Sequence, residues 1–109
     1  MAPTLFDALR TRGLAVGDVV LSLAGHDAGR PFVVLAVEPP FARLADGGAR
    51  PYAKPKRKRL SHVRPVGRIA GAEEALARIA AIRDGPAREA ALRGLLAGFL
   101  EEKGKEGPG

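Results

Sequence analysis

The 109-residue sequence contains no cysteine and no tryptophan. Without cysteine, disulfide bonds, thiolate metal ligands and cysteine nucleophiles are excluded. The sequence also lacks an apolar run near the roughly 18 residues of a membrane-spanning helix, and its first residues do not have the charged and apolar regions of a secretory signal peptide. We therefore expect a cytoplasmic protein whose chain can bury one modest hydrophobic core.

Residues for catalysis are scarce as well. His26 and His62 lie far apart in the sequence, and Ser22 and Ser61 belong to no nucleophile motif. No glycine-rich segment leads from a predicted strand into a helix, as a phosphate-binding loop requires. We expect a protein that is not an enzyme and that uses neither a metal nor another cofactor.

Positive charge is abundant, and it is concentrated in the middle of the chain. Residues 43–68 carry 9 Lys and Arg against 1 Asp, whereas residues 1–42 carry 3 basic against 4 acidic residues and residues 69–109 carry 6 against 7. The densest part is the basic run at residues 54–59. Charge segregated in this way attracts phosphates by long-range steering and counterion release, so the pattern favours a polyanionic partner.

The apolar pattern predicts a small β-domain over residues 15–68. In the first strand, Val19, Leu21 and Leu23 would share the buried face. Five short strands joined by tight turns are typical of a small SH3-like barrel. The strands are expected at residues 18–24, 32–37, 41–45, 49–52 and 60–65.

The turns of this domain are predicted from local signals. Asp46-Gly47 is typical of a tight hairpin, and Pro51 would make the fourth strand an edge strand. The basic run would then form a loop, and Pro65 would end the fifth strand.

Segments whose apolar residues have helical spacing flank the predicted β-domain on both sides. An N-terminal arm at residues 1–14 would contain a short helix that starts at Thr4 and stops at Gly13. Residues 69–103 would form an αα-hairpin whose turn lies at Asp84-Gly85-Pro86, with glycine ending the first helix and proline starting the second. Residues 104–109 form a polar, glycine-rich tail that we expect to be disordered. The apolar stripes of the two helices comprise Ala72, Leu76, Ile79 and Ile82, then Leu92, Leu95, Leu96, Phe99 and Leu100.

The first predicted hairpin carries a recognisable motif. Gly17-Asp18 precedes an apolar strand, Gly25 and Gly29 stand four residues apart in the turn, and Arg30 precedes a second apolar strand. This order resembles a KOW motif, and residues 15–66 are similar to the KOW-containing large-subunit ribosomal proteins of archaea and eukaryotes. The resemblance implies an SH3-like barrel that binds RNA, commonly ribosomal RNA, without catalysis. It also implies a positive φ angle at Gly29.

Backbone and shape recognition of folded RNA is the expected binding mode. The chain has four Phe, one Tyr and no Trp, which is little for stacking single-stranded bases. Tyr52 is the candidate stacking residue, although packing on the barrel explains it more simply. Arginine can contact phosphate through two hydrogen bonds at once. The candidate RNA-binding residues are Lys54, Lys56, Arg57, Lys58 and Arg59, supported by Gly25, His26, Gly29, Arg30, Arg50 and Arg64.

Three other interpretations of the same features stay open. The basic run could be a solvated loop that keeps the protein soluble. The chain could be an interaction adaptor, in which the helical hairpin presents an apolar groove to another protein and the barrel binds an acidic peptide. Contact with anionic lipid would lack an apolar anchor and would be weak and sensitive to salt.

Overall fold

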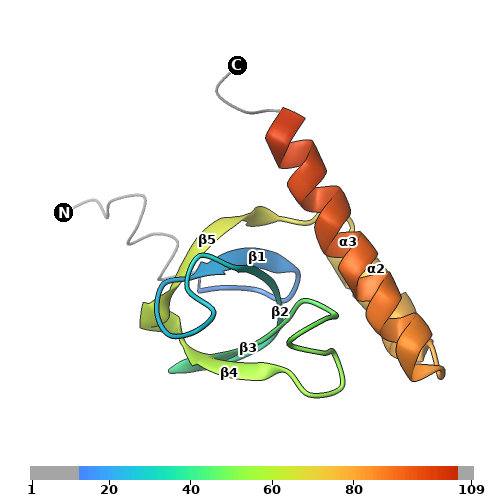
Figure 1. The fold of residues 1–109 in the computed structure, drawn as a ribbon, viewed down its shortest axis with the longest axis horizontal. Coiled ribbons are helices and arrows are strands. Elements are labelled where there is room, and N and C mark those ends of the chain that lie inside the picture. The colour runs from blue at the N-terminus through green and yellow to red at the C-terminus, as the bar shows by residue number, and fades with distance from the viewer. Residues whose placement is uncertain (1–12, 106–109) are drawn as a thin grey trace.

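A computed structural model describes residues 13–105, so the predicted helix at residues 4–12 lies outside the described residues. An antiparallel five-stranded sheet is followed by two helices (Figure 1). The elements are β1 (Asp18–Ser22), β2 (Pro31–Glu38), β3 (Phe41–Ala45), β4 (Lys56–Arg59), the 3₁₀-helix η1 (Leu60–His62), β5 (Val63–Arg68), α2 (Ala72–Ala81) and α3 (Gly85–Lys105).

The sheet is strongly curved. Its hydrogen-bonded order is β4-β3-β2-β1-β5, so the two outermost strands, β4 and β5, are consecutive in the chain and are joined only by η1. A connection this short requires the two edges of the sheet to approach each other, as the ribbon shows (Figure 1). Register shifts between Val19 and Val20 and between Val34 and Ala36 add to the curvature, because bulges increase the local bend and twist of a strand.

Each face of the sheet carries a buried cluster, since successive side chains of a strand point to opposite sides. Val20 and Phe32 belong to an inner cluster enclosed by the curved sheet, whereas Val19 and Val33 belong to an outer cluster beneath the helices. The prediction that Val19, Leu21 and Leu23 share the buried face was therefore wrong. Leu23 is 54% exposed, because β1 ends at Ser22 and the chain turns away.

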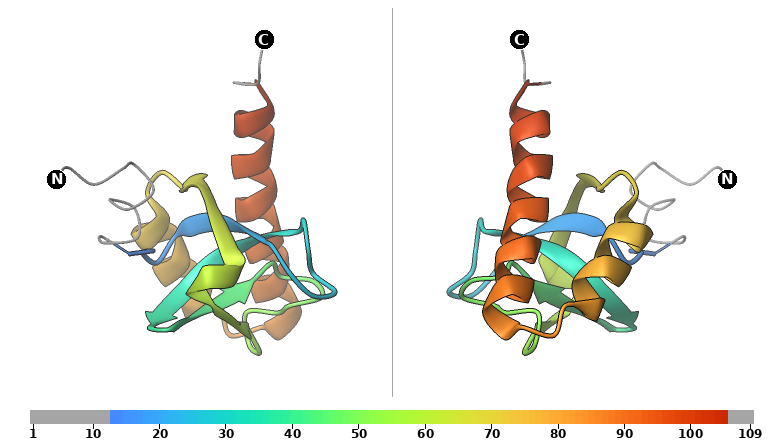
Figure 2. Two further views of the ribbon diagram at one scale, coloured as in Figure 1. Left: turned by 90° about the vertical axis from the view of Figure 1, so that its left-hand side faces the viewer. Right: turned by 90° about the vertical axis from the view of Figure 1, so that its right-hand side faces the viewer.

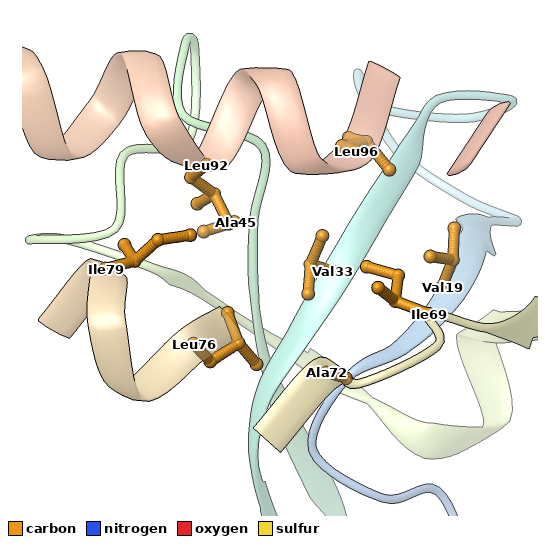
Figure 3. Packing of buried hydrophobic residues seen from close by; sticks show 9 residues of the cluster. All are labelled: Val19, Val33, Ala45, Ile69, Ala72, Leu76, Ile79, Leu92 and Leu96. Atoms are coloured by element: carbon orange, nitrogen blue, oxygen red, sulfur yellow. The ribbon is translucent and has the colours of Figure 1, made fainter. Parts of the chain in front are cut away.

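The helical hairpin covers the outer face of the sheet. The stripe residues Leu76, Ile79, Leu92 and Leu96 pack against residues such as Val33 (Figure 3). The two helices lie side by side in two views of the molecule (Figure 2). The predicted hairpin is confirmed, and it braces the sheet.

The ends of the helices differ slightly from the prediction. Gly85 begins α3 and does not end α2, which stops at Ala81. Asp84 caps α3, since its Oδ2 accepts the Ala87 N–H at 2.9 Å, and a carboxylate suits the positive end of the helix dipole. At its other end α3 continues to Lys105, so residues 104 and 105 of the predicted tail are helical, and residues 106–109 lie outside the described residues.

The predicted hairpin at Asp46-Gly47 does not form. Residues 49–52 are not a strand, and the chain from Asp46 to Pro55 is an irregular loop that docks on α3. Oδ1 of Asp46 accepts the N–H groups of Gly48 and Arg50, at 2.8 and 3.0 Å. Asp side chains offer the backbone this alternative to ladder hydrogen bonds, so the carboxylate folds the chain into a compact loop.

The basic run is not a loop. Lys56–Arg59 forms the edge strand β4, paired with β3. Residues 60–62 are the 3₁₀-helix η1, so the last strand begins later than expected. Pro65 does not end β5; it lies within that strand opposite Val20, next to the register shift, and bulges are among the few places where a sheet tolerates proline.

Helix α3 has 21 residues. Neither it nor α2 is long and apolar enough for a bilayer span, and these are the α-helices within residues 13–105.

Candidate nucleic-acid interface

The strand geometry of β4 divides the basic run between two sides of the sheet. Arg57 and Arg59 are exposed, whereas Lys56 and Lys58 alternate with them and are half-buried. This alternation follows from the two-residue period of a strand. The cations that we expected to form one loop surface therefore do not share one face of the sheet.

The outward-pointing arginines lie beside an aromatic ring. Arg59 is the register partner of Phe41, and Arg57 is the partner of Arg43. The Arg57 guanidinium lies over the Phe41 ring, 4.3 Å from its centroid, and the Arg59 guanidinium lies 5.2 Å from it. Both distances are in the range of cation–π attraction. We call Phe41, Arg43, Arg57 and Arg59 the β3–β4 surface.

Arg43 is held differently from the other two arginines of the β3–β4 surface. Its Nε donates to Glu38 Oε1 at 2.7 Å across the β2–β3 pair. Both side chains are about half exposed, so the ion pair contributes little to stability. The pair does partly neutralise Arg43, which leaves Arg57 and Arg59 as the stronger anion-binding groups.

Lys58 has an internal partner. Its Nζ donates to the Ala24 carbonyl at 2.7 Å, which joins the edge strand β4 to the turn after β1. A Cβ atom at Gly25 would lie 3.4 Å from the same nitrogen. This lysine therefore connects two parts of the curved sheet, and binding a phosphate would compete with that hydrogen bond.

The turn between β1 and β2 has the predicted glycine conformation. Gly25 has φ +80° and Gly29 has φ +82°, in the left-handed region that glycine adopts without penalty. The Gly29 N–H donates to the Ser22 carbonyl at 2.8 Å, and the Ser22 N–H donates to the Arg30 carbonyl at 3.0 Å. The expectation of a positive φ at Gly29 is confirmed.

Two of the predicted RNA-binding arginines form intramolecular ion pairs with aspartates. Nε and Nη2 of Arg50 both donate to Oδ2 of Asp27, at 3.2 and 2.9 Å, and the Asp27 side chain is only 8% exposed. Arg30 Nη2 lies 3.3 Å from Asp46 Oδ2. Both pairs join the β1–β2 turn to the loop between β3 and β4, so they position these loops.

The remaining predicted residues come from separate elements. Lys54 is exposed on the β3–β4 loop, His26 is exposed on the β1–β2 turn, and Arg64 is exposed on β5. Tyr52 packs against the outer cluster, with the Arg88 guanidinium 5.6 Å from its ring centroid. Packing is therefore the role of Tyr52 in this structure.

Sequence reasoning missed Phe41 and Arg43. It did not single out any phenylalanine as a surface residue, and it treated residues 54–59 as a loop. The signal that could have found the β3–β4 surface is alternation: Phe41, Arg43 and Ala45 share one face of β3, while Ala42 and Leu44 are buried on the other. No family model and no curated protein matches the chain.

Proposed function

We propose that this chain is a non-catalytic RNA-binding protein that binds folded RNA through the β3–β4 surface. The observation that carries the proposal is the pair of exposed guanidinium groups of Arg57 and Arg59, both placed over Phe41. Phosphates of a folded RNA are suited to such fixed, planar donors. Lys54, on the loop before β4, and Arg64, on β5, are further exposed cations.

The fold that we propose for the sheet is an SH3-like barrel of the KOW type. Three features support it: the short connection between the outermost strands, the bond from Lys58 to Ala24 and the inner apolar cluster. The KOW resemblance of residues 15–66 supports ribosomal RNA as the target and the cytoplasm as the location.

The adaptor alternative is not favoured. It requires exposed apolar stripes on the hairpin, whereas Leu76, Ile79, Leu92 and Leu96 are buried against the sheet. A groove of about 490 Å³ does lie between β5 and α3, lined in part by Leu95, Gly98 and Phe99. Nothing among residues 13–105 identifies an occupant for it.

Salt dependence is the direct test of this function. With about four to five cations engaged, the slope of log K against log salt should be about −3 to −5 for a folded RNA hairpin. Arg57→Ala/Arg59→Ala should weaken binding and make the slope less steep by about 2, because each lost phosphate contact removes about 0.9. The measurement is a series of fluorescence-anisotropy titrations at increasing salt.

Arg78→Ala/Arg83→Ala is the matched control. It removes the same net charge from exposed positions on and after α2, so it should leave the slope nearly unchanged. Equal effects of the two double variants would mean that only net charge matters and that the β3–β4 surface is not the contact site. A binding constant that does not depend on salt would contradict RNA binding through phosphates altogether.

A further inference from the structure

Phe41 contributes an aromatic ring to the positively charged β3–β4 surface. It is half-buried on β3, at the end of the strand opposite to Ala45, which lies beneath the helices. Its pairing partner across the sheet is Arg59, and Arg57 lies two residues before it. Ring and guanidinium groups therefore form one layered surface on the outer face of the sheet.

This surface is pre-organised. A free arginine side chain loses rotamer entropy when it is fixed, but packing over Phe41 already restricts Arg57 and Arg59. Guanidinium planes and aromatic rings are the groups on which proteins stack unpaired bases. The low count of aromatic residues argued against base stacking. That argument does not hold here, because a base can stack on the planar guanidinium group of an arginine.

The charges on this surface also indicate what kind of ligand fits it. The two guanidinium groups over one ring repel each other, and within residues 13–105 no carboxylate forms an ion pair with either. A neutral aromatic ligand would stack but leave the repulsion in place. A bare phosphate would relieve the repulsion but leave the planar face unused. A nucleotide provides both a π-face and a negative charge.

We infer that Arg57, Phe41 and Arg59 form a stacking site for an unpaired nucleobase of a folded RNA, with one guanidinium stacking on the base and the other binding the adjoining phosphate. The inference rests on the proposed function and names what the β3–β4 surface recognises. It changes the expected binding mode from backbone and shape recognition alone to one that also captures a bulged or loop nucleotide.

The test compares two RNA hairpins that differ only in a short bulge of unpaired adenosines. The full-length protein should bind the bulged hairpin about tenfold more tightly, because stacking a base on such a surface contributes about that factor. A fluorescent adenine analogue in the bulge should also change its emission on binding. Arg57→Lys/Arg59→Lys keeps the charge but removes the planar groups, so it should abolish the preference while retaining affinity for the paired hairpin.

Arg43→Lys is the matched control, since it lies on the same face but is held by Glu38 rather than by the ring. It should keep the preference for the bulge. If the wild-type protein binds both hairpins equally, or if Arg57→Lys/Arg59→Lys keeps the preference, the stacking site is disproved while RNA binding stands. If neither hairpin binds in a salt-dependent way, the proposed function fails, and this inference fails with it.

Discussion

Two glycines with the same backbone conformation have different surroundings. Gly29 and Gly47 have φ angles of +82° and +80°. Nothing lies within 4 Å of a Cβ built at Gly29, whereas at Gly47 a Cβ would be 2.4 Å from the Glu89 carbonyl oxygen and 2.8 Å from the Arg93 backbone nitrogen. Position 29 requires glycine only because its φ angle is positive. Position 47 requires glycine also because the loop approaches α3 closely there.

Alanine substitutions separate these two requirements. Gly29→Ala should lower the free energy of unfolding by about 1 kcal/mol, the cost of a left-handed alanine. Gly47→Ala should cost about 3 kcal/mol or more, because the loop must also move away from the α3 backbone and break the bond from Arg93 to the Gly47 carbonyl. Urea unfolding of both variants measures the difference. Equal costs would show that the loop is not held tightly against α3.

At the level of elements, local sequence signals predicted some segments well and others poorly. The strand predicted at residues 32–37 lies within β2, and both helices were predicted, because a continuous apolar run rich in β-branched residues and a 3.6-residue stripe are strong signals within one segment. In contrast, Lys56–Arg59 has no intrinsic strand signal. It becomes a strand because it pairs with β3, and pairing between separate segments cannot be read from a single one.

The positive charge of the candidate site was predicted from the sequence, but the arrangement of its side chains was not. The basic run was identified from composition, yet which of its side chains share a face depends on the strand period. Asp46 shows the same limit: Asp-Gly is typical of a tight hairpin, but here the carboxylate bonds Gly48 and Arg50 and closes a longer loop. A side-chain acceptor and a backbone ladder compete for the same N–H groups, and packing on α3 favours the first.

The loop between β3 and β4 and helix α3 should be energetically coupled through Glu89. Its carboxylate accepts the Tyr52 N–H at 2.6 Å and the Ala53 N–H at 3.3 Å, and hydrogen bonds to a charged acceptor are the stronger kind. Glu89→Gln should therefore lower the free energy of unfolding by about 1 to 2 kcal/mol and speed amide exchange at Tyr52. Glu74→Gln, at an exposed position on α2, should change neither. Unaltered exchange at Tyr52 would argue against the coupling.

At the scale of the whole molecule, packing and charge occupy different parts of the same sheet face. Ala45 lies beneath the helices, whereas Phe41 and Arg43, on the same face of β3, belong to the β3–β4 surface. The helical hairpin should thus contribute stability without contacting RNA. Removing it after residue 68 would expose Val19, Val33 and Ala45, so a fragment without the hairpin is expected to fold poorly.

Two leucines of α3 test this division of roles without deleting an element. Leu92 is fully buried in the outer cluster, whereas Leu100 is 36% exposed. Leu92→Ala should cost about 3 to 4 kcal/mol, from lost burial and the cavity left behind, and Leu100→Ala should cost less than about 1 kcal/mol. Urea unfolding measures both changes in stability.

At urea concentrations well below its unfolding midpoint, Leu92→Ala should bind the RNA hairpins with wild-type affinity and salt slope, because the β3–β4 surface stays intact. A folded Leu92→Ala protein that no longer binds RNA would mean that the packing of α3 shapes the binding surface, and the proposed division of roles between the helices and the β3–β4 surface would then be wrong.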